Sequence, residues 1–503
     1  MDARQKMKET AVAIPTRRNQ LFRTKSVEQS IRDTDEPGAK LRKDLTAWDL
    51  AIFGVAVVIG AGIFTLTART AGNVAGPSVS LAFVFAAIAC GLTALCYAEF
   101  ASTVPVAGSA YTFSYATFGE LAAWIIGWDL ILEFALAAAV VAKGWSQYLG
   151  DLVGSGPAVL HIGGVDFDWG AVLLIAALTV LLATGTKLSS RVSAVAVAIK
   201  IGVILLVIVV GLTFFDSSNL SPYIPPSEAG AEAEGVRQSL FSFLTGAGNS
   251  TFGWYGLLAA ASLVFFAFIG FDVVATAAEE TKNPQRDVPR GILGSLVIVT
   301  VLYVAVSLVL TGMVPYTDLA GNDATLATAF ALHGADWAKN IISVGALAGL
   351  TTVVMVMLLG QTRVLFAMSR DGLTPHVLAR TGKKGTPVRI TVIVGVACAL
   401  LAGFVEFGTL EEMVNIGTLF AFVLVSIGVL VLRRTRPDLP RGFRVPFVPV
   451  LPILAVLACL WLMLNLSVET WLRFVVWMVI GLVVYFAYGR QHSLLGKASS
   501  EQG

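Results

Sequence analysis

Twelve segments of the chain are dominated by apolar residues, and polar stretches separate them. Most are long enough for a helix to cross the hydrocarbon core of a bilayer, which takes about 17–25 residues. None shows the ~10-residue alternation of polar and apolar positions that marks the strands of a membrane barrel. The pattern predicts an all-α membrane protein with twelve transmembrane helices, at residues 47–68, 78–100, 121–148, 169–186, 192–215, 255–278, 291–313, 338–361, 388–404, 411–432, 447–466 and 471–488.

The polar stretches suggest how the chain is organised. Residues 1–45 lack the basic-then-apolar order of a signal peptide, so a cytosolic N-terminal tail is expected. The Pro, Gly and Ser content of the long loop predicts irregular extracytoplasmic structure. The expected parts are the tail 1–45, helices one to five at 46–215, the loop 216–254, helices six to ten at 255–433, helices eleven and twelve at 434–489, and a cytosolic C-terminal tail at 490–503.

The placement of Lys and Arg predicts the orientation. With the N-terminus inside, 29 of the 35 basic residues fall on the inner side, five fall outside, and Lys200 lies within a helix. Cytoplasmic loops of membrane proteins carry this excess. The count predicts a multi-pass protein of the cell membrane with both termini in the cytoplasm.

Composition narrows the class further. Hydrophobic residues make up 56% and charged residues 14%, against about 25% charged in soluble domains, and the mean hydropathy is +0.78. These values exclude an ordinary soluble enzyme or a disordered chain, and they make the lipid bilayer the expected surrounding. The net charge of +2 gives no reason to expect a nucleic-acid partner. The four cysteines lie in apolar runs and the four histidines outside them, so no metal site, cofactor or catalytic residue is expected.

Glycines interrupt the first and sixth segments at corresponding places. Gly60 and Gly62 lie within the first, and Gly270 lies in the sixth. Glycine weakens a helix, and paired interruptions in two halves indicate a transporter binding site at the midplane. The two segments are five helices apart, and because an odd offset reverses the direction of the chain, this predicts a five-plus-five inverted repeat with two further helices. The alternative is that these glycines only permit close helix packing.

Several motifs resemble one family. The stretch from Ile59 to Phe64 is similar to the first-helix motif of the amino acid–polyamine–organocation superfamily, whose fold has discontinuous helices one and six. The runs Phe265–Asp272 and Ala277–Pro289 resemble the signature of the cationic amino acid transporter family, and so does Gly91–Phe118. The resemblance covers about residues 42–445, and the chain lacks the two additional C-terminal helices of vertebrate members, which fits a bacterial type.

A broken helix offers both halves of an amino acid site. N–H groups after the break bind anions and carbonyls before it bind cations. We therefore expect the substrate carboxylate at Gly60, Ala61, Gly62 and Ile63, and the substrate ammonium at the carbonyls around Phe265, Phe266, Ala267 and Phe268. Phe266 could also stack over the substrate as a gate, or serve only in packing.

Three ionisable residues lie within the apolar segments. Glu133 is near the middle of the third, where a carboxylate is costly and functional by default. It is expected to hold a cationic substrate side chain, a role that the resemblance also implies; the alternative is a structural carboxylate. Asp129, one turn earlier, is a weaker candidate.

Lys200 lies deep in the fifth segment. Burial in the bilayer disfavours its ammonium form, so it could exchange a proton, and the resemblance implies that such a lysine stands where sodium sits in sodium-coupled relatives. The alternative is that it extends to the headgroups. Asp272 is a second candidate for proton coupling or a structural acceptor, and Thr351 and Thr352 could offer hydroxyls to Lys200.

The expected function is secondary active transport of amino acids, cationic ones such as arginine, lysine and ornithine first, by proton-coupled symport. The expected partners are a small amino acid substrate and protons, and nothing indicates an accessory subunit. The alternatives are a pH-independent exchanger or a permease for neutral or varied amino acids. A channel or an intramembrane enzyme is disfavoured, because no nucleophile–base pair or continuous polar path is recognisable.

Overall fold

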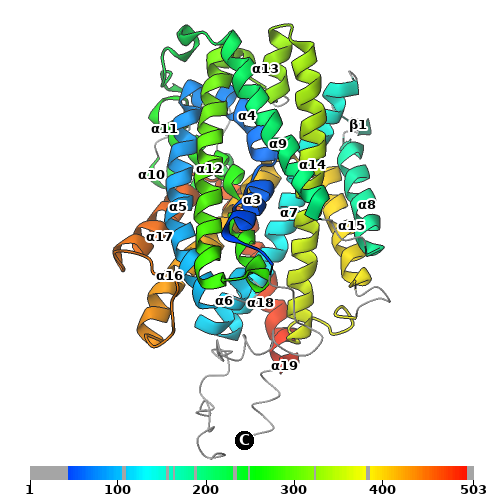
Figure 1. Ribbon diagram of the computed structural model, residues 1–503, viewed down its shortest axis with the longest axis vertical. Coiled ribbons are helices and arrows are strands. Elements are labelled where there is room, and N and C mark those ends of the chain that lie inside the picture. Colours follow the sequence, from blue (N-terminus) through cyan, green and yellow to red (C-terminus); the bar gives the residue numbers. More distant parts are fainter. Residues whose placement is uncertain are drawn as a thin grey trace, which may run out of the picture.

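The computed structural model describes residues 44–104, 109–153, 158–162, 165–185, 190–229, 235–246, 250–321, 325–380 and 386–494. It is a bundle of helices that run mostly along the long axis of the molecule (Figure 1). Eight helical stretches are long and apolar enough to cross a membrane, and four shorter apolar helices accompany them, at Ala47–Val58, Trp169–Ala183, Val388–Phe404 and Val450–Leu464. The all-helical membrane class is therefore confirmed, whereas twelve crossings remain a prediction.

Each apolar segment contains a helix. The main ones are α3 (Ala47–Val58), α5 (Val79–Thr103), α7 (Glu120–Val153), α8 (Trp169–Ala183), α9 (Ser190–Gly211), α11 (Gly253–Val264), α12 (Pro284–Met313), α14 (Asp336–Arg370), α15 (Val388–Phe404), α16 (Phe407–Thr435), α17 (Val450–Leu464) and α18 (Val468–Val484). Local signals set several ends: Thr46 and Asp49 form a capping box at α3, and Pro284 is the first residue of α12.

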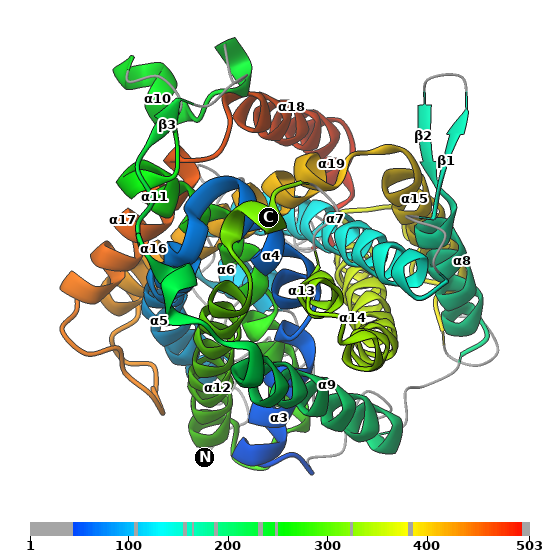
Figure 2. The same ribbon diagram turned by 90° about the horizontal axis from the view of Figure 1, so that it is seen from above.

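The centre of the bundle is built from closely packed pairs. The view from above shows α7 beside α14 and α12 beside α3, with α8 and α15 at one flank and α17 at the other (Figure 2). Glycines allow the approach of α12 to α3, since a Cβ at Gly291 would lie 2.5 Å from Leu50 Cβ. Without a hydrophobic driving force in lipid, such small-residue contacts allow the close van der Waals packing that holds helices together.

The connections contain more regular structure than the sequence predicts. Strands β1 (Val159–Ile162) and β2 (Val165–Asp168) form an antiparallel hairpin. In the loop expected to be irregular, β3 (Glu228–Ala229) pairs with β4 (Ser250–Thr251), and α10 (Leu240–Thr245) lies between these two strands in the sequence. The N-terminal tail lies outside the described residues, apart from Asp44 and Leu45.

The described part of the expected C-terminal tail is folded onto the bundle. Helix α19 (Arg490–His492) ends beside Ser493, whose buried hydroxyl donates to Glu120 Oε2 at 2.5 Å. Tyr485 donates to the other oxygen of Glu120 at 3.1 Å. These residues therefore belong to the body of the protein.

A buried carboxylate fastens α5 to α16 and to the segment that follows it. Glu99 accepts from Arg433 Nε at 2.8 Å and from Arg433 Nη2 at 2.5 Å. The Val445 N–H donates to it at 2.7 Å, and Arg441 Nε lies 3.3 Å away. One carboxylate thus serves two guanidinium groups and a backbone amide.

Replacing this carboxylate should destabilise the protein. Glu99→Ala leaves two arginines without their partner, and breaking such a buried pair costs about 3–5 kcal/mol. The matched control is Glu469→Ala, because the Glu469–Arg473 pair is 40% and 37% exposed and should contribute less than about 1 kcal/mol. Thermal unfolding in detergent measures both, and equal losses in the two variants would contradict the role of Glu99.

Candidate functional site

Two interrupted helices meet at the centre of the bundle. After α3, Ile59 is extended (φ −69°, ψ 96°), and the chain resumes as η2 (Gly62–Leu66) and α4 (Thr67–Thr70). After α11 and η8 (Phe265–Phe268), Ile269 is extended and Gly270 takes a φ of +111°, which favours glycine; η9 (Phe271–Glu280) then follows. The two interruptions predicted from the glycines are therefore present.

The interrupted helices touch backbone to backbone. A Cβ placed on Gly62 would lie 2.2 Å from Ala267 Cα and 2.4 Å from Ala267 Cβ. No side chain other than hydrogen fits there without moving one of the helices. Gly60, by contrast, has its nearest neighbour at 3.6 Å, an ordinary contact with Val353.

Side chains from three other helices donate hydrogen bonds to backbone carbonyls that lie before the interruptions. Lys200 on α9 donates to Ala56 O at 2.6 Å, and Tyr303 on α12 donates to Val58 O at 2.9 Å. Asn415 on α16 donates to Ser262 O at 3.0 Å. All three side chains are buried, and a buried carbonyl without a partner is costly. These hydrogen bonds offset the free-energy cost of leaving backbone carbonyls without a helical partner inside a bilayer.

A small cavity of about 20 Å³ lies between the interrupted helices and the α7–α14 pair. That volume holds about one water molecule and is far too small for an amino acid. Its lining is almost entirely apolar: Val57, Val58, Gly60, Ala61, Gly62, Phe266 and Ile269 come from the interrupted helices, and Ala137, Val141, Val353 and Met357 come from α7 and α14. The structure is therefore a closed form of this site.

The expected main-chain residues divide into two groups. Gly60, Ala61, Gly62 and Phe266 line the cavity, whereas Ile63 is buried and does not. At the second interruption, Phe265 packs edge-on against Phe422, with ring centroids 5.7 Å apart, and Phe268 packs on Tyr303 at 5.4 Å. Ala267 is the contact of Gly62. Among the four residues of η8, Phe266 is thus the one placed to meet a ligand by its side chain.

Glu133 does not line the cavity, although it lies on α7, one of the helices that do. It is on α7 one helical turn before Ala137, and its carboxylate faces Asp272 and Thr418. Asp129, a further turn away, is completely buried, and neither of its oxygens accepts a hydrogen bond from the described residues. Three buried acidic side chains therefore gather beside the site.

Asp272 and Lys200 lie beside backbone groups of the two interruptions. Asp272 is in the first turn of η9, near the N–H groups of Gly270 and Val273, and its Oδ1 accepts no hydrogen bond from the described residues. Lys200 has its stem against Gly349 and its amine on Ala56 O. The hydroxyls of Thr351 and Thr352 donate to carbonyls of their own helix at 2.7 Å, so their suggested contact with Lys200 stays a prediction.

Several residues of the site escaped sequence reasoning. Asn415 is an amide in an apolar segment, a signal that could have marked it. Tyr303, Val353 and Met357 are ordinary residues of membrane helices, and only the packing shows that they reach the site.

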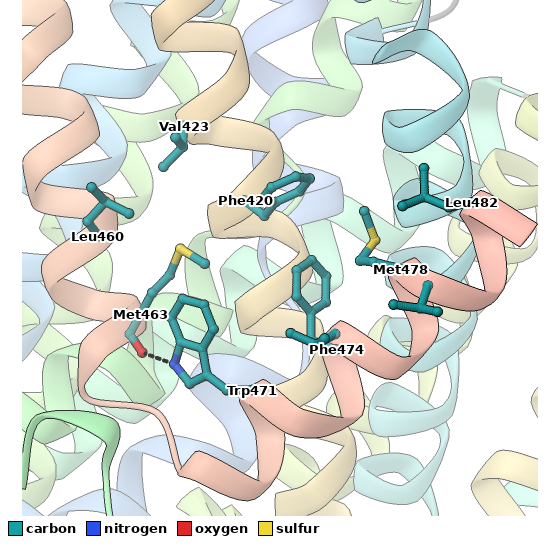
Figure 3. Close-up of a pocket in the computed structure, with 10 residues that line it drawn as sticks. Phe420, Val423, Leu460, Met463, Trp471, Phe474, Met478 and Leu482 are labelled. Carbon is teal, nitrogen blue, oxygen red and sulfur yellow. Dashed lines mark hydrogen bonds between the residues drawn. The ribbon is translucent and has the colours of Figure 1, made fainter. Parts of the chain in front are cut away.

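A second hollow lies between α16, α17 and α18 and has only apolar side chains around it (Figure 3). The indole N–H of Trp471 donates a hydrogen bond to Met463 O at 2.9 Å, as the dashed line shows. The hollow offers no polar group to an amino acid and is not the candidate site.

Comparisons with known proteins bear on the whole chain. A family model described as amino acid permease matches residues 45–487. The branched-chain amino acid permease BcaP of Bacillus subtilis (strain 168) is 46% identical over 490 residues, 95% of this chain and 99% of that protein. The methylthioribose transporter of the same organism is 43% identical over 488 residues, with the same coverage. The cationic amino acid transporter 2, vacuolar, of Arabidopsis thaliana is 40% identical over 427 residues, 83% of this chain and 64% of that protein.

The contact between the interrupted helices predicts a large difference between two glycines. Gly62→Ala should destabilise the protein by about 3 kcal/mol, because its methyl group meets backbone atoms of Ala267. Gly60→Ala adds the same group at an ordinary contact distance and should change stability by less than about 0.5 kcal/mol. Thermal unfolding in detergent compares them. A Gly62→Ala protein as stable as Gly60→Ala would show that the helices do not touch as described.

Proposed function

Because the chain belongs to the amino acid permease family of the amino acid–polyamine–organocation superfamily, we propose that it is a secondary transporter working by alternating access. Its relatives are transporters and not enzymes, and amino acids are the substrate class of the family. The observation that carries the mechanism is the small cavity at two helix interruptions. At about 20 Å³ it holds no amino acid, so the helices around it must move apart for a substrate to enter and leave.

The proposed architecture is twelve transmembrane helices in the cell membrane, with both termini in the cytoplasm. Helices one to five (46–215) and six to ten (255–433) form the inverted repeat, and residues 434–489 add two helices. The placement of 29 basic residues on one side supports the orientation. The loop 216–254, the hairpin β1–β2 and α13 (Leu326–Leu332) then lie outside.

The substrate backbone is proposed to bind between the two interruptions. Its carboxylate would take the N–H groups of Gly60, Ala61, Gly62 and Ile63, which begin the second half of helix one, where no side chain caps the backbone. Its ammonium would take carbonyls of Phe265, Phe266, Ala267 and Phe268. Phe266 lies in the cavity wall and would close over the substrate.

The apolar wall favours an apolar substrate side chain. Ala137, Val141, Val353 and Met357 offer no charge to a guanidinium or ammonium group. Two relatives that match over almost their whole length are both named branched-chain amino acid permease BcaP, whereas a third is named a methylthioribose transporter. We therefore place small and branched apolar amino acids first.

Cationic amino acids are the second candidate, and Glu133 is the observation that favours them. Residues four apart share a helix face, so a long side chain that passes Ala137 would meet the Glu133 carboxylate and then Asp129. Relatives named as cationic amino acid transporters also match.

Uptake into proteoliposomes distinguishes apolar from cationic amino acids as the substrate. Labelled leucine, alanine, arginine and lysine would be offered with and without an inward proton gradient. Saturable uptake of one class identifies the substrate, and uptake of none of them would overturn amino acid transport.

The wall predicts how selectivity changes. Met357→Ala enlarges the cavity, so bulky apolar substrates should gain over alanine by roughly tenfold, the scale of a small change in pocket size. Met355→Ala, a buried methionine two residues away that does not line the cavity, should cost stability and leave the ratio alone. Competition of leucine and phenylalanine against labelled alanine measures the ratio. An equal shift in both variants would remove Met357 from the site.

Glu133→Gln separates the two substrate classes. The change keeps shape and removes the charge, so arginine affinity should fall by roughly 1.5–3 kcal/mol, the worth of a charge-assisted hydrogen bond. Alanine affinity should change less. Competition binding with both amino acids gives the comparison, and equal responses would make Glu133 structural.

Protons are proposed to couple through Lys200. Its amine contacts Ala56 O one turn before the interruption and forms no ion pair among the described residues. If water reaches the Lys200 amine in only one of the outward-open and inward-open states, the lysine binds its proton with a different affinity in each state. Substrate binding then follows the proton gradient by linkage.

Lys200→Ala should therefore make uptake independent of pH. In the unchanged protein, uptake should fall as external pH rises and the inward gradient disappears, whereas the variant should give a flat profile and still exchange substrate. Lys339→Ala, a partly exposed lysine near the start of α14, is the control and should keep the pH dependence. A pH profile unaltered by Lys200→Ala would exclude the lysine as the proton carrier.

A further inference from the structure

The position of the cavity defines which parts must separate. One side of it is formed by helices one and six, and the other by α7 and α14. Any passage from the cavity to the outside runs along the seam between these two sides. This reasoning rests on the proposed function, because it takes the cavity as the transport site and α13 as external.

On the outer side, a single tyrosine closes the seam. Tyr148 on α7 is fully buried, and its hydroxyl donates to Phe64 O, beyond the interruption in helix one, at 2.6 Å. The two rings meet edge to face, with centroids 6.2 Å apart. One turn earlier, a Cβ at Gly144 would lie 3.1 Å from Thr65 Oγ1. The glycine lets the two helices come close enough for the tyrosine to reach its acceptor.

The short helix α13 covers the same place. In the view from above it lies over the junction of α4, α7 and α14 (Figure 2). Its inward side chains are fully buried, among them Leu326, Ala327 and Phe330. Thr325, at its start, donates to Asp151 of α7 at 3.2 Å. The Tyr148 hydroxyl also lies beside Thr325 and the Leu326 N–H.

We infer that Tyr148 is the outer latch of the transporter. Its hydroxyl joins α7 to the outer half of helix one, and Thr325 joins the start of α13 to α7 beside it. Opening to the outside must pull Phe64 O away from it and lift α13 from Asp151. The latch is uncharged, so it holds the outer side shut without drawing on the proton that Lys200 is proposed to carry.

The chain offers a control for the latch. Tyr485 is likewise fully buried and donates to Glu120 at 3.1 Å, on the same helix α7 that carries Tyr148. Glu120 is the first residue of α7, whereas Tyr148 lies near its other end. Removing the Tyr485 hydroxyl deletes a buried tyrosine hydrogen bond that does not cross the seam.

The test measures access from outside. Thr65→Cys would be introduced after replacing Cys90, Cys96, Cys398 and Cys459, and intact cells would be treated with a membrane-impermeant maleimide. Thr65 is buried at the seam, so labelling reports the open state. Tyr148→Phe should speed labelling about fivefold, as expected for one lost hydrogen bond, while Tyr485→Phe should not.

A second pair of variants, at the start of α13, tests the latch even if Tyr148→Phe fails to fold. Thr325 and Thr328 form the two halves of the capping box of α13, but only Thr325 contacts Asp151. Thr325→Val should speed labelling, and Thr328→Val should do so less. Equal labelling of Tyr148→Phe and its parent, or equal effects within either pair, would overturn the latch. Labelling needs no substrate, so absent amino acid uptake would defeat the proposed function separately.

Discussion

Backbone carbonyls that lose their helical partner must find another donor inside the membrane, and this requirement shapes the centre of the molecule. The first interruption is held by Lys200 and Tyr303, and the second by Asn415. Each donor comes from a different helix. Because no water is available in the hydrocarbon core, these bonds fix α9, α12 and α16 around the site as firmly as apolar packing does.

The donors differ in what they allow. A tyrosine hydroxyl and an asparagine amide keep one protonation state, so Tyr303 and Asn415 are suited to permanent support. A lysine amine can lose a proton, which changes how strongly it holds Ala56 O. Of the three donors, Lys200 is therefore the one whose hydrogen bond to the first helix would depend on a proton, and the proposed coupling rests on this difference.

The sequence allowed the helical class, the two interruptions and the residues at Gly60–Gly62 to be predicted, because glycine and apolar length act locally. It did not show that Gly62 touches Ala267, that Met357 and Val353 complete the wall, or that Glu133 is not part of it. Those facts depend on how each helix is rotated about its axis against its neighbours, and these contacts cannot be read from one sequence taken alone. The hairpin β1–β2 was missed because its strands are only four residues long.

An acidic cluster lies beside the apolar wall of the cavity. Asp129, Glu133 and Asp272 are buried, with no cation among their described contacts. Like charges buried near one another repel, so ionising all three acids at once is unfavourable in this form. A cationic group that entered beside them would offset this repulsion. The cluster is therefore the physical reason for keeping cationic amino acids as the second candidate, even though the wall itself is apolar.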